Sequence, residues 1–575
     1  MGDKMKLDTK IISSLEKVFP DEVKGEILKS ATLLKNEPFS FQIAFKNKDG
    51  INDVIPSYVK VESNMPTEYI SQYLVGYVPV LKAQIKDSDN NFDRKTPGLY
   101  PDILFPRVTN SPIEDEGLPW LPRFLEKNEK YLISSVDDSY QALWFTVNEQ
   151  CANLESGKYF IKIIFYSSKD NECLAEEKIQ LNIVDAILPP QTLIYTSWFH
   201  CDCLADTYNV EVFSDRFFEI MRSYVLQATK NGMNMILLPA FTPALDTPEG
   251  KNRKTVQLVS VNYENGKYTF DFSLMKKYID LCKECGIKYF EHSHFFTQWG
   301  AKNAPQIMAM QDGEYKQLFG WETDATSAEY AFFLKSYLNA LKTFLKEIDL
   351  GNNIMFHISD EPDCKCLEYY KNAQKIVGDE LKDFACADAL SHFEYYKKGY
   401  VKKPVVIVSS DEIDMFADNC EDYWVYYTGA QLSDSYSNRI IPITSARNRV
   451  IGLQMYVGNA KGFLHWGYNY YYDVLSHGLF NPIANPCGYN QLAGTSYVVY
   501  PDISGEALMS LRLKVQYEGF NDYRALQKLE SLIGRGGTLK FIKDTVGKVD
   551  YKFCPTGKQL FEFRQKLNDE ILKNI

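Results

Sequence analysis

The stretch that decides the fold reads Asn353-Ile354-Met355-Phe356-His357-Ile358-Ser359-Asp360-Glu361-Pro362. A short apolar run leads directly into two adjacent carboxylates, and a proline follows them. This pattern is typical of a buried parallel strand whose carboxyl end opens into a site, because such strands are apolar on both faces. A structural alternative is that Asp360 and Glu361 cap the next helix, where acidic side chains complement the helix dipole.

Similar apolar runs recur along the chain after residue 193, and helical segments alternate with them. The eight runs are Leu193–Phe199, Met233–Leu238, Ile287–His294, Ile354–Ile358, Phe384–Ala387, Val405–Val408, Tyr423–Tyr427 and Gly462–Trp466. Helices are expected over 213–231, 273–286, 327–348, 364–377, 411–420, 438–458 and 505–533, with a weak helical signal over 391–399. This alternation predicts an α/β (β/α)8 TIM barrel. A doubly wound open sheet is the alternative, but it favours a Gly-rich turn after the first strand, and Thr196-Ser197-Trp198-Phe199-His200 has no glycine.

The first 188 residues have the composition and alternation of β structure. Six strands are expected: Phe39–Phe45, Tyr58–Val61, Tyr69–Val78, Gln141–Val147, Tyr159–Tyr166 and Lys178–Val184. A Pro-rich stretch over 97–106, which continues to Pro122, is interpreted as irregular. The fold class is therefore multidomain, with an N-terminal all-β sandwich over 1–188 and a barrel over 193–535. Residues 536–575, with a helix over 557–572, are expected to form a helical tail packed on the barrel.

Composition excludes several classes of partner. The formal net charge is −12, and no Lys/Arg cluster stands out, so we expect no nucleic acid partner. The charged start, Met1-Gly2-Asp3-Lys4-Met5-Lys6, lacks the apolar segment of a signal peptide, and no run approaches the ~18 apolar residues of a membrane span. We therefore expect a cytoplasmic protein without membrane insertion and without an obligate protein partner.

The cysteines are expected to be free thiols in a reducing compartment, because no signal peptide precedes the chain's 12 cysteines. The close pairs are Cys201/Cys203, Cys282/Cys285 and Cys364/Cys366. Their spacing does not form the repeated CxxC array of a zinc site, so no metal is expected.

The barrel prediction places Asp360 and Glu361 at the end of the fourth strand, on the face where barrel enzymes build their sites. Polar and aromatic residues gather at the other predicted strand ends. They include Trp198, His200, Glu291, His294, Asp388, Tyr426, Tyr427, Gln431, His465, Trp466, Tyr468 and Asn469. Each residue taken alone fits a core or rim position, whereas their common location predicts a site.

Enzymes that cleave glycosidic bonds usually use a pair of carboxylates at such a place. Ordinary glycosidases hold two carboxylates on different strands, ~5–5.5 Å apart when retaining and ~6.5–9.5 Å apart when inverting. The seventh strand end, 426–431, holds no acid, although Glu291 could serve as a nucleophile. An adjacent pair suggests substrate assistance instead. Glu361 would protonate the leaving oxygen, and Asp360 would accept a hydrogen bond from a 2-acetamido group that attacks the anomeric carbon.

Four segments together resemble glycoside hydrolase family 123, the retaining β-N-acetylgalactosaminidases, and the DUF4091 group around it. They are His357–Pro362, Leu99–Leu104, Gly462–Asn469 and Leu511–Arg524. The resemblance implies a β-sandwich followed by a (β/α)8 barrel, with no metal or organic cofactor. It also implies exo-removal of terminal β-linked N-acetylgalactosamine (GalNAc) from glycans, including glycosphingolipid oligosaccharides.

The resemblance also implies roles for individual residues. The family's aspartate corresponds to Asp360, which orients the acetamido group, and its glutamate corresponds to Glu361, the general acid and then base. A tyrosine should bind the acetamido oxygen, and Tyr427 and Tyr395 are the candidates. Trp466 is expected to form the wall on which the sugar packs. Further substrate contacts are expected from Trp198, His294, Asp388 and Asn469.

Other functions remain open at this stage. One is a conventional two-carboxylate glycosidase for sugars without an acetamido group, and another is a non-catalytic carbohydrate-binding barrel protein. A metal-dependent barrel hydrolase is more distant. Preference for galacto or gluco sugars depends on contacts to O4, which no motif in the sequence specifies.

Overall fold

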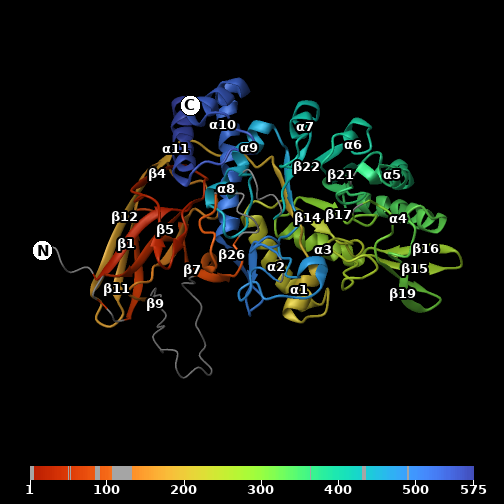
Figure 1. Cartoon of the computed structure of the whole chain (residues 1–575), viewed down its shortest axis with the longest axis horizontal. Helices are drawn as coiled ribbons and strands as arrows, with labels where there is room; N and C mark the ends of the chain where they lie inside the picture. Colours follow the sequence, from red (N-terminus) through yellow and green to blue (C-terminus); the bar gives the residue numbers. More distant parts are fainter. Residues whose placement is uncertain are drawn as a thin grey trace. The chain divides into compact units, whose positions relative to one another are not determined.

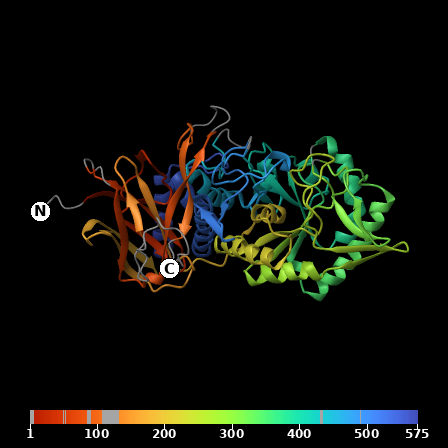
Figure 2. The same cartoon turned by 90° about the horizontal axis from the view of Figure 1, so that it is seen from below.

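The computed structural model describes residues 6–48, 51, 54–83, 91–106, 132–298, 300–362, 364–429, 435–488 and 491–575. Contacts divide the chain into two compact units (Figures 1 and 2). The first comprises Met1–Pro190, Arg439–Gln454 and Leu508–Ile575, and the second comprises Gln191–Asn438 and Met455–Ala507. The division after Pro190 falls between the predicted sandwich, 1–188, and the predicted barrel, 193–535.

The first unit contains a β-sandwich. One sheet has the order β1 (Leu7–Ser13), β5 (Phe39–Asn47), β10 (Gln141–Val147), β7 (Ile70–Val80) and β8 (Gly98–Pro106), and β26 (Ala507–Ser510) pairs with β8 through Met509 and Ser510. The other has the order β4 (Ser30–Leu34), β12 (Cys173–Val184), β11 (Gly157–Ser167), β6 (Ile55–Ser63) and β9 (Leu132–Ser135). Each of the six predicted strands is present within these elements. Short elements elsewhere in the chain are β2 (Val18–Phe19), β3 (Glu22–Val23), β25 (Val499–Pro501), η1 (Thr67–Tyr69), η2 (Gly351–Asn353), η3 (Cys364–Cys366) and η4 (Val474–Ser476).

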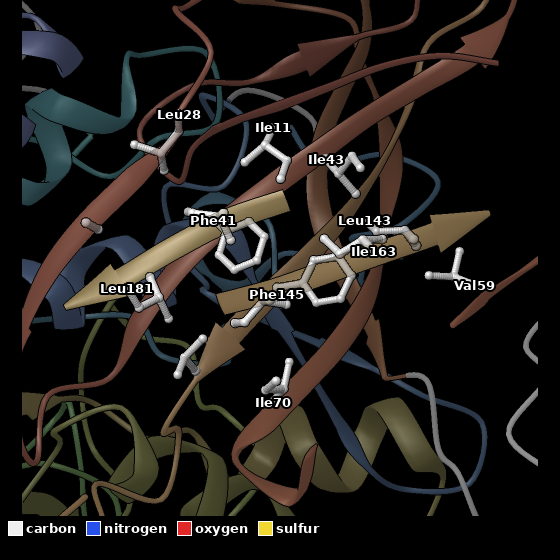
Figure 3. Close-up of a cluster of buried hydrophobic side chains, with 14 of the residues drawn as sticks. Ile11, Leu28, Phe41, Ile43, Val59, Ile70, Leu143, Phe145, Ile163 and Leu181 are labelled. Carbon is white, nitrogen blue, oxygen red and sulfur yellow. The ribbon is translucent and has the colours of Figure 1, made fainter. Parts of the chain in front are cut away.

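The core of the sandwich forms because alternate residues of each strand point inward. Phe41 and Ile43 of β5 face Ile163 of β11 and Leu181 of β12 in this core (Figure 3). The rings of Phe41 and Phe145 stack with centroids 5.2 Å apart. Such burial of large apolar side chains is the main stabilising contribution to the unit.

Strand β8 corrects one prediction, because residues 97–106 were expected to be irregular. The segment pairs with β7, and the register shifts between Gly76 and Tyr77 so that Asp102 is the extra, bulged residue. A proline lacks the N–H that a regular ladder needs, and it is tolerated in a strand beside such a bulge. Pro101 is therefore the reason why this segment was not predicted as a strand from the sequence. The remainder of the Pro-rich stretch, 107–122, lies outside the described residues.

The C-terminal helices α10 (Leu511–Val546) and α11 (Gly557–Lys573) belong to the first unit. Helix α11 starts at a capping box formed by Thr556 and Gln559. It lies against β4, where Asn568 Nδ2 donates to the Thr32 carbonyl over 2.8 Å. The tail thus contacts the sandwich, whereas the sequence suggested that residues 536–575 pack on the barrel. The domain bounds 1–188, 193–535 and 536–575 stay a prediction.

The second unit contains a closed parallel barrel, which confirms the TIM-barrel prediction over the open sheet. Its strands, in order, are β13 (Ile194–Ser197), β14 (Met235–Leu238), β17 (Tyr289–His292), β20 (Ile354–Phe356), β21 (Ala385–Leu390), β22 (Lys403–Ile407), β23 (Trp424–Tyr426) and β24 (Gly462–His465). Pairing of β24 with β13 closes the barrel. Gly462 leaves room for the neighbouring strand, because a Cβ there would lie 2.2 Å from the Trp424 ring.

Helices connect the strands, as the alternation predicts (Figure 1). They are α1 (Cys201–Tyr208), α2 (Asp215–Lys230), α3 (Ser273–Glu284), α4 (Ala328–Glu347), α5 (Leu367–Leu381), α6 (Glu394–Lys397), α7 (Ile413–Asn419), α8 (Ser445–Arg449) and α9 (Ile451–Gly458). Helix α4 shows why: Ser327 caps its first turn, and Tyr330, Phe333, Leu334 and Tyr337 form one buried stripe. In the described part of the chain, no helix is both long and apolar enough to cross a membrane.

A small four-stranded sheet is inserted into the barrel and was not expected. Its order is β16 (Lys267–Asp271), β15 (Ser260–Glu264), β18 (Ile307–Gln311) and β19 (Glu314–Phe319). The first hairpin lies in the connection from β14 to α3 and the second in that from β17 to α4. Both connections leave the carboxyl ends of barrel strands, so they enlarge the face where a barrel site is expected.

Candidate active site

A pocket with about 670 Å³ of space lies at the carboxyl ends of the barrel strands. Its lining residues are Trp198, His200, Leu245, Asp246, Gln298, Asp360, Glu361, Ala389, Tyr426, Thr428, Leu464 and Trp466. The structure thus brings together six of the residues that the sequence places at strand ends: Trp198, His200, Asp360, Glu361, Tyr426 and Trp466. Apolar walls with a few polar groups are typical of a small-ligand site.

The two adjacent acids both line the pocket because the backbone turns at Glu361. The φ angle of Glu361 is +42°, in the left-handed region, which costs a non-glycine residue about 1–2 kcal/mol. On a regular strand consecutive side chains would point to opposite faces. Glu361 Oε1 accepts a hydrogen bond of 2.6 Å from the Tyr426 hydroxyl, which holds this carboxylate on the side of β23.

Asp360 presents an open carboxylate. No donor among the described residues hydrogen-bonds either of its oxygens. Burial, together with the neighbouring Glu361 carboxylate, raises the pKa of Asp360 well above 3.8, although His357 opposes this. Asp360 therefore holds a proton more tightly than an isolated aspartate does.

A buried imidazolium lies beneath the pocket. His357 Nε2 is 2.7 Å from Glu291 Oε1, and His357 Nδ1 is 3.3 Å from Asp388 Oδ1. Burial disfavours the charged ring, yet the two carboxylates outweigh it and raise the pKa of His357 to about 10. At neutral pH the ring is therefore protonated and donates to both acids.

Glu291 is fully buried, and both of its carboxylate oxygens accept hydrogen bonds. Its Oε1 also accepts from the Trp198 indole N–H over 2.5 Å, and its Oε2 accepts from the Thr196 hydroxyl over 2.9 Å. Glu291 therefore fixes the Trp198 wall. The sequence left Glu291 open as a nucleophile, but it is not among the described lining residues of the pocket.

His294 and Asp388, both predicted to contact substrate, belong to the same buried layer. The His294 ring stacks on His357 with centroids 4.5 Å apart, and burial lowers the pKa of His294 well below 6.5. Asp388 accepts from the Ile358 N–H over 3.0 Å and from the Tyr370 hydroxyl. They support the pocket from below and do not appear in its described lining.

The ligand atoms of His294, His357 and Asp388 lie within 4.8 Å of one another, a spacing that a metal ion can bridge. The donor chemistry fits a metal poorly, because both His357 nitrogens carry protons that are hydrogen-bonded to carboxylates. The cluster fits a buried proton network better than a metal centre.

The two predicted tyrosines lie elsewhere. The Tyr427 ring packs on Phe463, with centroids 5.1 Å apart, and the Tyr395 ring packs on Tyr370 at 5.3 Å. Neighbouring residues of a strand alternate across the barrel wall, so Tyr426 faces the pocket and Tyr427 does not. The described lining accordingly includes Tyr426 and neither predicted tyrosine.

Asn469 acts on the pocket through His200. It accepts from the His200 N–H over 2.8 Å and donates to the His200 carbonyl over 3.1 Å. The His200 ring is in turn held by the Trp466 carbonyl at 2.8 Å and by Arg253 at 3.1 Å. Asn469 therefore positions one wall of the pocket.

Sequence reasoning missed Asp246 and Gln298. Both lie in the long connections that follow β14 and β17, and no motif marks them. Asp246 N–H donates to Gln298 Oε1 over 2.7 Å, so the two connections support each other. The only signal in the sequence was the position of both residues after barrel strands.

The family model of the glycoside hydrolase 123 catalytic domain matches residues 198–529. A family 123 glycoside hydrolase from Clostridium perfringens, whose structure was analysed for the details of glycolipid glycan hydrolysis, has a TM-score of 0.71 at 13% sequence identity. The match covers 99% of this chain and 97% of that one.

Two further solved structures are much less similar to this chain. A putative β-galactosidase from Bacteroides fragilis has a TM-score of 0.30 at 8% identity, over 90% of this chain and 62% of that one. A putative glycoside hydrolase from Bacteroides vulgatus has a TM-score of 0.30 at 9% identity, over 84% and 77%. Among curated proteins, none matches the chain. Since the family model matches more than half of the 575 residues, this chain belongs to glycoside hydrolase family 123.

Proposed function

We propose that the protein is a retaining exo-β-N-acetylgalactosaminidase, which hydrolyses terminal β-linked GalNAc from glycans such as glycosphingolipid oligosaccharides by substrate-assisted catalysis. The observation that carries this proposal is the pair Asp360 and Glu361 in one pocket, with an open carboxylate on Asp360. The position of Glu291 supports it further, because that residue holds Trp198 and is not among the described lining residues of the pocket. The family resemblance supports the choice of GalNAc.

In the first step Glu361 donates its proton to the leaving glycosidic oxygen. The acetamido oxygen of the substrate attacks the anomeric carbon as the glycosidic bond breaks, and an oxazolinium ion forms. Asp360 accepts the acetamido N–H and balances the developing positive charge. Glu361 then removes a proton from water, which opens the oxazolinium, and two inversions give net retention.

The other pocket residues act on substrate position. Trp198 and Trp466 offer apolar faces on which a sugar can pack, and their orientations are fixed by Glu291 and by contact with the Tyr470 ring at 5.1 Å. Tyr426 keeps Glu361 in place by donating its hydroxyl to that carboxylate. His294, Asp388 and Asn469 contribute through the residues that they hold.

The first test is release of 4-nitrophenol from its N-acetyl-β-D-galactosaminide, with the gluco epimer and the plain β-galactoside in parallel. We expect turnover to require the 2-acetamido group. Hydrolysis of the plain galactoside at a similar rate would instead favour the two-carboxylate mechanism. Glycan binding without any turnover would favour a non-catalytic protein.

Two substitutions separate the roles of the acids. Glu361→Gln should lower kcat/KM by about 10²–10⁴-fold for poor leaving groups and much less for activated ones, because only poor leaving groups need the proton. Asp360→Asn should impair both kinds of substrate. Asp312→Asn, in the exposed turn between β18 and β19, serves as the control. Near wild-type activity of Asp360→Asn would rule out the acetamido mechanism.

A further inference from the structure

The pocket holds a third acid, Asp246, which the proposed reaction does not use. Asp246 lies in the connection after β14, and its φ angle is +44°. The left-handed backbone is held by two hydrogen bonds, from Asp246 N–H to Gln298 Oε1 at 2.7 Å and from Ser476 Oγ to the Asp246 carbonyl at 2.8 Å. A strained conformation that its surroundings hold in place is typical of a functional position.

The two carboxylate oxygens of Asp246 have different surroundings. Oδ2 accepts from the Tyr470 hydroxyl over 2.5 Å and from the Leu475 N–H over 3.1 Å. Among the residues that the structure describes, nothing donates to Oδ1. The side chain is thus locked through one oxygen, and the other remains an open acceptor on a residue of the pocket lining.

Neighbouring polar groups on the same side are already engaged. Gln298 uses its amide oxygen for Asp246 and its amide nitrogen for the Thr247 carbonyl, at 2.9 Å. His200 uses both ring nitrogens, for Trp466 and Arg253. Asp246 is therefore the group on this side that can take a hydrogen bond from a ligand.

The order of strands around the barrel places Asp246 apart from Asp360 and Glu361. Asp360 and Glu361 follow β20, Gln298 follows β17, and Asp246 follows β14. If the proposed function is correct, C1 lies at Glu361 and the 2-acetamido group lies at Asp360. The ring positions farther from C1 then extend toward Asp246.

We infer that Asp246 is a specificity-determining residue whose Oδ1 accepts a hydrogen bond from the 4-hydroxyl of the terminal sugar, which makes it the group that senses galacto or gluco configuration. The inference rests on the proposed function and deepens it. A carboxylate suits this task because it only accepts hydrogen bonds and a sugar hydroxyl can donate one. A hydroxyl in the other configuration would leave the buried acid without its partner.

The test compares kcat/KM for the aryl N-acetyl-β-galactosaminide, its 4-deoxy analogue and its gluco epimer in wild type, Asp246→Asn and Asp246→Ala. Wild type should favour the parent over the 4-deoxy substrate by about 10- to 100-fold, the range for a hydrogen bond to a charged group. In Asp246→Ala this preference should fall to nearly one. Unfolding temperatures verify that the variants fold, and asparagine tolerates the left-handed backbone.

Asp206→Asn is the matched control, because Asp206 also accepts from a tyrosine hydroxyl, that of Tyr472, outside this pocket. It should keep the wild-type substrate ratio. An unchanged ratio in Asp246→Ala, or an equal loss on parent and 4-deoxy substrates, would overturn the inference, since a merely structural role affects both alike.

A binding measurement separates this inference from the proposed function. Calorimetry with Glu361→Gln compares the affinity for free N-acetylgalactosamine with that for its 4-deoxy analogue, and no turnover is needed. Weaker binding of the analogue supports the role of Asp246 even if the wild type hydrolyses none of the aryl glycosides. Equal affinities, or no binding of either sugar, refute it.

Discussion

At the residue scale, Asp360 and Glu361 have unlike surroundings, although they are adjacent. In the proposed mechanism Asp360 must be ionised to accept the acetamido N–H, and its pKa is raised above 3.8 by burial and by Glu361. For an activated aryl glycoside, kcat/KM should therefore fall as pH decreases through a pKa higher than that of an ordinary aspartate. The measurement is the pH profile of kcat/KM at constant ionic strength.

The substitution Glu361→Gln should move this acid limb to lower pH. It removes the neighbouring negative charge, so Asp360 ionises more readily. The activated substrate keeps enough turnover for the profile to be measured. An acid limb at the same pH in wild type and Glu361→Gln would contradict the coupling of the two carboxylates.

The tyrosine pair at the end of β23 allows a second test at this scale. Tyr426→Phe removes the hydrogen bond to Glu361 and should lower kcat/KM by about 10-fold, the effect of losing a hydrogen bond to a charged group. Tyr427→Phe should have a much smaller effect, because its ring packs on Phe463. Steady-state kinetics of both variants test this prediction. A larger loss of kcat/KM in Tyr427→Phe than in Tyr426→Phe would favour Tyr427, which the sequence analysis named as a candidate.

At the scale of elements, the buried network joins three neighbouring strands of the barrel, β17, β20 and β21, to β13, which lies beyond β14. Glu291 belongs to β17, Asp388 to β21, and His357 directly follows β20, while Trp198 directly follows β13. Because a protonated His357 ring can donate to both carboxylates, its contribution to the network is complete only while it carries both protons.

The free energy of unfolding should therefore depend on pH above neutrality. The pKa of His357 is raised to about 10 in the folded state, against about 6.5 when unfolded. Its contribution is complete below pH about 6.5 and is lost as pH rises through about 10. Urea unfolding between pH 6.5 and 10 should show this decline, and His357→Gln should flatten it. A parallel decline in the variant would assign the effect to other groups.

At the scale of the whole molecule, two of the motif segments serve the fold of the first unit. Asp102, at the β8 bulge, accepts from Arg512 Nε and Nη2 at 2.9–3.0 Å, and both side chains are buried. In α10, Asp522 likewise accepts from Arg449 over 2.7 Å. These pairs join segments that are far apart in the sequence.

Arg512→Gln should lower the stability of the chain by about 3–5 kcal/mol, because it leaves a buried carboxylate without its partner. Thermal unfolding measures the loss. Asp102→Asn combined with Arg512→Gln should cost less than the sum of the single changes. Lys540→Gln, which breaks an exposed ion pair in α10, is the control and should leave the unfolding temperature almost unchanged. Additive single and double effects would show that the pair does not interact.

The sequence by itself determined the barrel and the adjacent acids at the end of its fourth strand. Each barrel strand is a short apolar run, because a parallel strand is buried on both faces, and this pattern is local. Asp360 and Glu361 are adjacent in the chain and directly follow such a run, so their position at the strand end needed no knowledge of distant contacts.

The tertiary structure alone decided which groups face the pocket. Adjacent residues of a strand point to opposite sides, so the sequence could not show whether Tyr426 or Tyr427 faces the pocket. Glu291 is a supporting residue of the pocket because it accepts hydrogen bonds from Thr196, Trp198 and His357, which come from other strands or strand ends. The role proposed for Asp246 depends on long connections that bring Tyr470 to one of its oxygens and leave the other open. Local patterns determine elements, whereas the partner of a polar group depends on residues that only the closed barrel brings together.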